Sequence, residues 1–342
     1  MSRERSWTIY IAQDKHLDYD WCGAETEIEP RMAALVDGYL DLAEAGRARW
    51  NLDCALWLEV YRRQRGEAGA ARLLDAIRQG WIGYGAQVNV ALWGLMGPDL
   101  AARALAAGRE IEQATGRAAH TALIMENAGL SWGVAQMLAD GGVRYVARGI
   151  YDLRGESYVA QRAPYPLYWW VAPDGSRLLT HWPPYDSTRT WGGYGEASEL
   201  LRLAGEDWDA FHLQRAGDRN TPEVYAARVA YIQATVARYE ALGDAYPVSQ
   251  IMLLGTGWDN WTITDDVSRF IERYNAEEDG RIRLVDARYD EFFAAVEREV
   301  AERGLILPEQ RGSYGACWEE WGAHLAGAHA DFRRAERLLP QI

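Results

Sequence analysis

The sequence predicts an α/β fold in which helices cover a parallel β-sheet. Two observations support it: the first half of the chain alternates short β-branched runs with longer helical patterns, and the links between them are short. A third is that polar residues follow four successive predicted strands. The number of domains stays open, because 342 residues suit either two domains or one α/β barrel.

The bounds of the predicted elements come from hydrophobic periodicity and turn residues. Apolar and β-branched runs predict strands at Trp7–Ala12, Ala48–Leu52, Trp81–Val90, Thr121–Met125, Arg144–Ala147, Ser249–Leu254 and Ile282–Asp286. Helical spacing predicts helices at Pro30–Ala45, Leu56–Arg63, Gly69–Gln79, Gly97–Thr115, Leu130–Asp140, Pro222–Leu242, Tyr289–Arg303 and Cys317–Leu339. Between residues 151 and 195, an Asp174-Gly175 pair among aromatic residues predicts the turn of a β-hairpin.

The charge balance argues against two classes of partner. The chain has 36 Lys and Arg against 50 Asp and Glu, a net charge of −14, which repels phosphate backbones and anionic lipids. We therefore expect neither nucleic acid nor a membrane as a partner. Three cysteines are too few for a disulfide framework, and the N-terminus has no apolar signal segment, so the expected location is the cytoplasm.

The aromatic composition is unusual. There are 16 Trp and 19 Tyr but only 5 Phe. Trp and Tyr carry a polar group on an apolar ring, which suits stacking on half-polar ligands such as sugars. A core that happens to use Trp accounts for the same counts, so composition leaves both readings open.

Polar residues at the ends of predicted strands form the candidate site, because such ends converge at one edge of a parallel sheet. They are His16 and Asp18, Asp53, Gln87 and Asn89, and Glu126 and Asn127. His16-x-Asp18 places an imidazole and a carboxylate on one side of an extended segment, where they can chelate a divalent cation. The structural alternatives are a buried ion pair for His16, and helix capping for Asp53 and Glu126.

With these motifs in order, the chain resembles the N-terminal domain of glycoside hydrolase family 38, the retaining α-mannosidases. The motifs are His16-x-Asp18-x-x-Trp21, Glu126-Asn127-Ala128-Gly129-Leu130-Ser131, Thr180–Asp186 and Leu253–Asp259. The resemblance implies a seven-stranded-type (β/α) barrel of the glycoside hydrolase and deacetylase kind over residues 1–310. It also implies that a C-terminal helical segment, residues 311–342, begins a helical domain.

The resemblance further implies the roles of individual residues. His16, Asp18 and Glu126 would bind a divalent metal, zinc in that family. Glu126 would also be the nucleophile, with Asp259 as the acid that protonates the leaving oxygen. Residues expected to contact a carbohydrate substrate are Trp21, Asp53, Asn127, His181, Tyr185, Asp186, Trp258, Asn260 and Trp261. The structural alternatives are a stabilised Pro-rich loop around His181 and core packing for the tryptophans.

Three features depart from the family pattern. Glu126 is one methylene longer than the aspartate of the family. Gly257 occupies the acid position in an ungapped reading, and Asp259 lies two residues on, on the same side of an extended chain. The last metal-ligand histidine of the family has no match in the sequence other than His324 or His329.

Three hypotheses follow for the activity. The first is a metal-dependent retaining glycosidase that cleaves an α-glycosidic bond. The second is a carbohydrate-binding or scaffold protein on a degenerate barrel, motivated by the displaced acid and the missing histidine. The third is a metal-dependent deacetylase, motivated by Asp14, Asp18 and Asp20. The sequence leaves a homo-oligomer or further C-terminal domains open.

Overall fold

A computed structural model covers residues 1–342. It describes residues 5–15, 19, 23–89, 91–125, 130–149, 165–182, 197, 200, 221–255, 264–278, 280–314 and 324–338. The chain divides into two compact units, each assembled from separate stretches of sequence. Unit 1 comprises residues 1–84, 115–117 and 195–306, and unit 2 comprises residues 85–114, 118–194 and 307–342.

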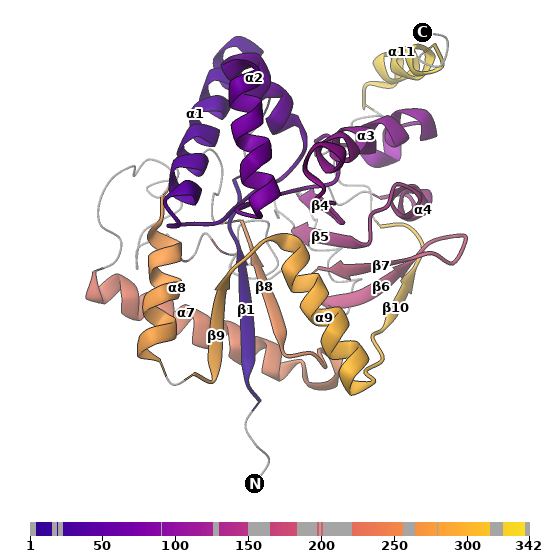
Figure 1. Ribbon diagram of the computed structural model, residues 1–342. Helices are drawn as coiled ribbons and strands as arrows, with labels where there is room; N and C mark the ends of the chain where they lie inside the picture. Colours follow the sequence, from indigo (N-terminus) through magenta and orange to yellow (C-terminus); the bar gives the residue numbers. More distant parts are fainter. Residues whose placement is uncertain are drawn as a thin grey trace. The chain divides into compact units, whose positions relative to one another are not determined.

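The main sheet of unit 1 has three parallel strands in the order β8-β1-β9 (Figure 1). Its strands are β1 (Trp7–Ala12), β8 (Gln250–Leu254) and β9 (Ile282–Asp286), and a separate parallel pair consists of β2 (Trp50–Leu52) and β3 (Ile82–Tyr84). In β1, Ile9 and Ile11 are buried, whereas Thr8 and Tyr10 are half-buried. This alternation gives β1 one core face and one outer face.

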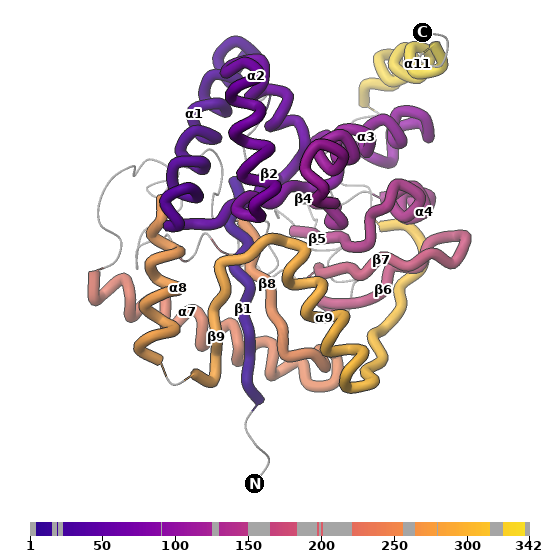
Figure 2. The backbone as a smooth tube through the Cα atoms, viewed as in Figure 1, coloured from indigo at the N-terminus to yellow at the C-terminus, as the bar shows by residue number. Residues whose placement is uncertain are grey.

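The helices of unit 1 are α1 (Glu25–Glu44), α2 (Leu56–Gln79), α7 (Pro222–Ala241), α8 (Asp266–Glu277) and α9 (Tyr289–Arg303), with a 3₁₀ turn η3 at Gly243–Ala245. Helices α1 and α2 pack side by side (Figure 2). Helix α2 is broken at Gly66, whose φ of 69° lies in the left-handed region that glycine adopts at little cost. Thr221 caps α7 by accepting a hydrogen bond from the backbone N–H of Val224.

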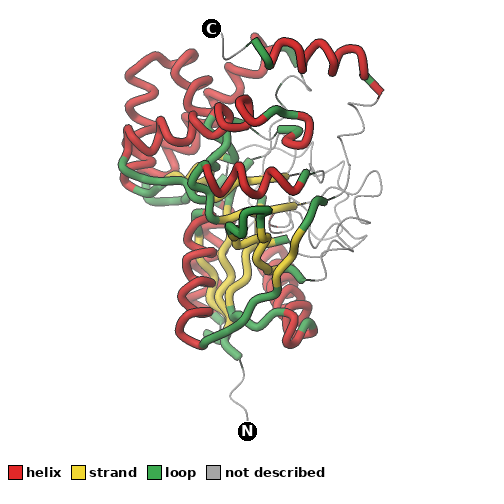
Figure 3. Tube along the Cα trace, turned by 90° about the vertical axis from the view of Figure 1, so that its right-hand side faces the viewer, coloured by secondary structure: helices red, strands yellow, loops and turns green. Residues whose placement is uncertain are grey.

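The sheet of unit 2 has the order β10-β6-β7-β5-β4. Its strands are β4 (Thr121–Met125), β5 (Tyr145–Gly149), β6 (Leu167–Val171), β7 (Arg177–His181) and β10 (Glu309–Arg311). Strands β6 and β7 form an antiparallel hairpin, and the other pairings in this sheet are parallel. Figure 3 distinguishes strands, helices and loops by colour. The carboxyl ends of β4, β5 and β7 therefore lie at one edge of the sheet.

The helices of unit 2 are α3 (Pro98–Thr115), α4 (Trp132–Asp140) and α11 (Ala326–Glu336), with a 3₁₀ turn η1 at Trp93–Leu95. Leu105 of α3 and Val134 of α4 join the core formed with Ile124 of β4. A Cβ on Gly108 would lie 2.3 Å from the carbonyl oxygen of Ala86, so α3 can pack this closely only with glycine at that position.

Most predicted elements are confirmed, and several have the predicted bounds, such as Trp7–Ala12, Thr121–Met125 and Tyr289–Arg303. The predicted hairpin around Asp174 is confirmed by the antiparallel pairing of β6 and β7. The break between the two helices predicted within residues 56–79 is confirmed by the kink at Gly66. Among the described residues, no helix is both long and apolar enough to cross a membrane.

Other expectations were wrong in detail. The strand predicted from Trp81 ends at Tyr84, because the next backbone donors bond elsewhere: the N–H of Ala86 to Thr121 and that of Val88 to Ala104. Helix α1 begins at Glu25 rather than at the predicted Pro30. Helix α8 and strand β10 were not predicted. Of the helix predicted over residues 317–339, the described part is α11, and residues 315–323 lie outside the described ranges.

Candidate functional site

Asn51 joins the strand ends of unit 1 and is only 1% exposed. Its Nδ2 donates to the carbonyl oxygens of Gln13 (3.0 Å) and Ala287 (2.9 Å), and its Oδ1 accepts from the backbone N–H of Tyr289 (3.3 Å). Its backbone N–H also donates to Gln13 (2.8 Å). One side chain of β2 thus connects the segments that follow β1 and β9 with the first residue of α9.

Gln13 continues the chain beyond β1 and is fully buried. Its Nε2 donates to Ser268 Oγ (2.8 Å) and Asp286 Oδ1 (2.9 Å), and Ser268 Oγ donates to Asp286 Oδ2 (2.7 Å). Burial raises the pKa of Asp286, although these donors oppose the rise. The segment that leads from β1 toward His16 is therefore fixed by both α8 and β9.

Asp14 lies two residues before His16 and is 5% exposed. Its Oδ2 accepts a hydrogen bond of 2.6 Å from the phenol of Tyr289. Burial raises the pKa of Tyr289 far above its usual value, and the charge of Asp14 acts in the same direction. Sequence analysis missed the supporting roles of Asn51 and Tyr289. The available signal was an amide within a buried strand, next to the polar residues at its end.

Asp53 is a predicted site residue that the structure describes, and it lies just beyond β2. Its Oδ1 accepts a 2.6 Å hydrogen bond from Nε1 of Trp57, the second residue of α2. Burial, followed by the charge of Asp53, raises the pKa of the buried thiol Cys54. The ring of buried Tyr39 lies 4.4 Å from that of Trp50. Asp53 thus has a local structural partner at the predicted strand end, and its contact with substrate stays a prediction.

His181 is another predicted site residue within the described ranges, and it ends β7. It pairs with Ala147 of β5 and Leu167 of β6, and it is fully buried. Burial lowers the pKa of His181 to about 3, so the imidazole is neutral at neutral pH. A neutral imidazole offers one donor and one acceptor nitrogen at the carboxyl edge of this sheet.

Arg148 lies beside this edge within a wall of aromatic rings. Its guanidinium carbon is 3.9 Å from the ring centroid of Trp182 and 5.0 Å from that of Tyr314. The hydroxyl of Tyr314 donates to the hydroxyl of Tyr168 (2.9 Å), and burial raises the pKa of Tyr314 to about 12. These contacts keep a permanent cation inside unit 2 by cation–π attraction. Part of the tryptophan excess therefore serves the core, at Trp7, Trp93, Trp170 and Trp182.

Gln87, at the predicted end of the third strand, is buried; its Nε2 donates to the carbonyl oxygen of Leu123 (2.7 Å) and its Oε1 accepts from the N–H of Leu123 (3.2 Å). The residues predicted to bind metal or substrate or to act in catalysis, other than Asp53 and His181, lie outside the described ranges: His16, Asp18, Trp21, Glu126, Asn127, Tyr185, Asp186, Trp258, Asp259, Asn260 and Trp261. Within the described ranges, no three His, Cys, Asp or Glu side chains are grouped so as to bind a metal ion. The predicted metal ligands therefore stay predictions, and the described residues offer no alternative set.

Comparisons with solved structures support the predicted fold class. The structure of an alpha-mannosidase from Enterococcus faecalis V583 matches with a TM-score of 0.67 and 19% identity, covering 90% of this chain and 31% of that one. A family 38 glycosyl hydrolase from Enterococcus faecalis matches with a TM-score of 0.60 and 17% identity, covering 91% and 29%. A 4-alpha-glucanotransferase from Thermococcus litoralis matches with a TM-score of 0.53 and 11% identity, covering 90% and 40%.

The family of this chain is shown by a match between its sequence and a family model. The chain spans less than a third of the two Enterococcus proteins, and a search of curated proteins gave no match. Residues 6–315 match the family described as glycosyl hydrolases family 38 N-terminal domain. That range contains every predicted site residue, and its fold is the predicted α/β barrel type. The chain therefore belongs to glycoside hydrolase family 38, through the N-terminal domain of that family.

Proposed function

We propose that the chain is a glycosidase that cleaves α-mannoside-type bonds with retention of configuration. The observation that carries this proposal is the family match over residues 6–315, which spans both proposed catalytic carboxyl groups. The structural similarity to an alpha-mannosidase from Enterococcus faecalis V583 supports the choice of sugar. The substrate is accordingly a carbohydrate, and the cytoplasmic location expected from the sequence stays a prediction.

Two carboxyl groups would perform the chemistry. Asp259 protonates the glycosidic oxygen as the bond from that oxygen to the anomeric carbon breaks, while the carboxylate of Glu126 attacks that carbon. Water then hydrolyses the glycosyl ester, with Asp259 accepting its proton. Such pairs stand about 5–5.5 Å apart in retaining enzymes. Glu126 is one methylene longer than the aspartate of the family, and the acid is shifted from position 257 to 259. The two carboxyl groups reach this separation only if one change offsets the other.

We further propose that His16, Asp18 and Glu126 bind a divalent metal, preferably zinc. The support is the family, whose members depend on metal in general, together with the His-x-Asp spacing. A metal would polarise the hydroxyl groups of the sugar. The network of Asn51 and the Asp14–Tyr289 hydrogen bond would hold the segment that carries two of these residues.

A second candidate function is carbohydrate binding without turnover. The specific observation in its favour is Gly257, which has no acidic group at the position where an ungapped reading places the acid. Two further proposals concern the organisation of the chain. We propose that residues 311–342 begin a helical domain, to which α11 would contribute.

A homo-oligomer stays a prediction from the sequence.

Release of nitrophenol from 4-nitrophenyl α-mannoside tests the catalytic proposal. We expect turnover by the native chain and a loss of about 10³-fold or more in Glu126→Gln, because nucleophiles of covalent mechanisms contribute at least this much. Glu302→Gln is a matched control, since Glu302 is exposed at the end of α9 and outside the proposed site. Activity should be lost on dialysis against EDTA and return with zinc.

Each part of the proposal has its own contrary outcome. Turnover that survives EDTA excludes the metal. Equal activity in Glu126→Gln and Glu302→Gln excludes Glu126 as nucleophile. Mannoside binding measured by calorimetry, without turnover of any aryl α-glycoside, establishes the binding protein instead. Acetate release from acetylated sugars would establish the deacetylase alternative.

A further inference from the structure

A groove of about 430 Å³ lies on the outer face of the β8-β1-β9 sheet in unit 1. Strands β1 and β9 form its floor and α9 forms one wall. The lining residues are Thr8, Tyr10, Arg283, Val285, Glu291, Ala294 and Arg298. The groove begins at the amino-terminal halves of the strands, whereas the proposed catalytic residues follow the carboxyl ends. It is therefore a separate feature of the unit.

The groove follows from strand register and helix periodicity. Thr8 pairs with Arg283 and Tyr10 pairs with Val285, so these four side chains form one patch on the outer face. Glu291, Ala294 and Arg298 lie on one face of α9, at spacings of three and four residues. The small side chains of Thr8 and Ala294 leave the space between sheet and helix unfilled.

The two arginines of the groove have donors that no other described residue engages. Within the described residues, Arg283 and Arg298 have neither a hydrogen bond nor an ion pair, and both are exposed. The nearby carboxylate Glu291 is already engaged, by the guanidinium of Arg49 (3.0 Å) and the backbone N–H of Arg288 (2.8 Å). The two arginines therefore keep their donors for a ligand that enters from solvent.

The phenol of Tyr10 lies within the field of both arginines. Burial raises the pKa of Tyr10, and the charges of Arg298 and Arg283 oppose that rise, whereas Glu291 reinforces it. Both guanidinium groups therefore act on the same point in the groove. Glu291 and Glu299 also act on this phenol, but both carboxylates have other partners: Arg49 and Arg288 for Glu291, and Ser249, Gln250 and Arg303 for Glu299. In a chain of net charge −14, two convergent cations form a local exception.

We propose that this groove binds a small phosphate-type oxyanion through Arg283, Arg298 and the hydroxyl of Tyr10. Guanidinium groups present paired N–H donors that match the geometry of phosphate oxygens, and a phenol adds a neutral donor. The volume suits inorganic phosphate or the phosphate of a sugar phosphate. The proposal is independent of the glycosidase activity, since none of these residues belongs to the proposed catalytic or metal-binding set.

Titration calorimetry with inorganic phosphate tests the proposal on the full chain. We expect saturable binding by the native protein and a loss of about a hundredfold in Arg283→Ala/Arg298→Ala, because each of the two charge-assisted contacts contributes about tenfold. Tyr10→Phe should weaken binding less. Binding should also weaken with added NaCl, as expected for partly exposed charges.

The matched control is Arg103→Ala/Arg109→Ala, which removes two exposed arginines from another groove, on α3 in unit 2, with the same change in net charge. Circular dichroism and thermal unfolding check that each variant is folded. Equal losses in both double variants, or no binding by the native chain, would overturn the proposal. Tighter binding of a hexose 6-phosphate would identify a phosphorylated sugar as the ligand, and equal binding would identify free phosphate.

Discussion

Asn51 shows how one buried amide can organise the strand ends beside a predicted site. Both its amide donors and its acceptor are satisfied by backbone groups of two segments: Gln13 after β1, and Ala287 and Tyr289 at the junction of β9 and α9. A buried polar group contributes little net energy when it is paired, but it is costly to leave its partners unpaired.

Asn51→Ala should therefore lower the free energy of unfolding by on the order of 3 kcal/mol, because Ala287 O and Tyr289 N–H lose their buried partner. Urea denaturation measures the change. Asn275→Ala is the control: Asn275 also makes two hydrogen bonds to one backbone, that of Leu284, but it is exposed. Asn275→Ala should lower the free energy of unfolding by about 1 kcal/mol or less. Equal losses in Asn51→Ala and Asn275→Ala would contradict the argument from burial.

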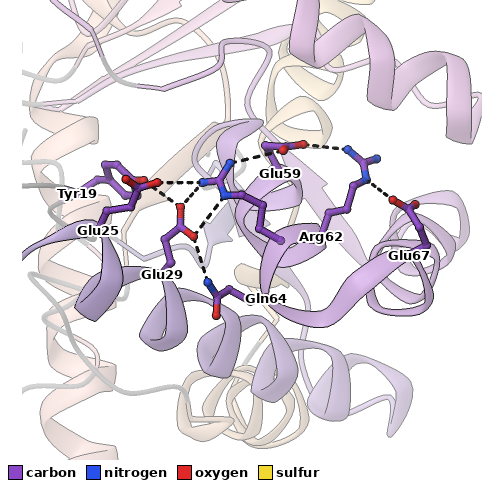
Figure 4. Close-up of polar contacts among 8 residues, drawn as sticks. Tyr19, Glu25, Glu29, Glu59, Arg62, Gln64 and Glu67 are labelled. Atoms are coloured by element: carbon purple, nitrogen blue, oxygen red, sulfur yellow. Dashed lines mark hydrogen bonds and ion pairs between the residues drawn. The ribbon is translucent and has the colours of Figure 1, made fainter.

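At the scale of elements, α1 and α2 are joined by a buried carboxylate. Glu29 of α1 accepts hydrogen bonds from Arg63 and Gln64 of α2, and from Tyr19 at 3.0 Å (Figure 4). The guanidinium of Arg63 lowers the pKa of Glu29 to about 2, although burial alone would raise it. Glu59 holds Arg63 from the other side. The helix pair is thus held by charge as well as by apolar packing.

This depressed pKa makes the stability of the helix pair depend on pH. The unfolded chain takes up the proton first as the pH falls, so the stabilisation is complete above about pH 5.5 and is lost between about 4.5 and 2. Glu29→Gln should reduce the free energy of unfolding at pH 7 by about 1–2 kcal/mol, allowing for solvent screening at the partly exposed Arg63.

Denaturation of the two proteins from pH 7 to pH 3 measures this effect. The difference between native chain and Glu29→Gln should shrink steadily as the pH falls. Glu25→Gln is the control, because Glu25 is exposed and 3.9 Å from Arg63, so its effect should stay within about 0.5 kcal/mol. A difference for Glu29→Gln that stays constant with pH would show that its charge does not matter.

At the scale of the whole molecule, each compact unit is built from stretches distant in sequence. In unit 2, residues 309–314 return to the sheet: β10 pairs with β6, Gly312 O accepts from Trp170 Nε1 (3.1 Å), and the hydroxyl of Tyr314 donates to Tyr168 (2.9 Å). Tyr314 also forms a bridge to Leu130. This segment is therefore part of the core of unit 2.

Ending the chain after Ile306 should destabilise unit 2 by on the order of 4 kcal/mol, because buried groups of Tyr168 and Trp170 lose their partners. Ending it after Ala323 instead removes α11, whose contacts with the rest of unit 2 include the hydrogen bond from the N–H of Gly97 to Glu336. That cut should cost less. Thermal unfolding compares the two, and equal melting temperatures would contradict the role of residues 309–314.

The elements that the sequence predicted well are those whose pattern is local. β1, β4, β9 and α9 have apolar periodicity that ends where the element ends. The predicted length of β3 was too great. The residues after Tyr84 keep an alternating apolar pattern, but their backbone N–H groups donate to β4 and α3. Helix α8 was missed although Val267, Phe270, Ile271 and Tyr274 have helical spacing. The very short β10 depends on pairing with a strand far away in sequence.

For the candidate site too, the sequence identified some residues and missed others. The sequence identified Asp53 and His181 as polar residues at strand ends, and the structure places both there. It did not identify the supporting partners, Tyr289 for Asp14 and Trp57 for Asp53. Tyr289 lies 275 positions from Asp14, and no local pattern can indicate a hydrogen bond of that kind. The remaining predicted site residues stay predictions.

By itself, the sequence determined the alternation of strands and helices, the polar residues at strand ends and the family, because periodicity and motif order are local properties of the chain. Only the tertiary structure decided which polar residues have partners among the described residues, such as Asn51 with the backbone and Asp14 with Tyr289, and which do not, such as Arg283 and Arg298 in the groove. The physical reason is that burial and hydrogen bonding depend on contacts between distant segments, and the strand register of β1 and β9 sets those contacts.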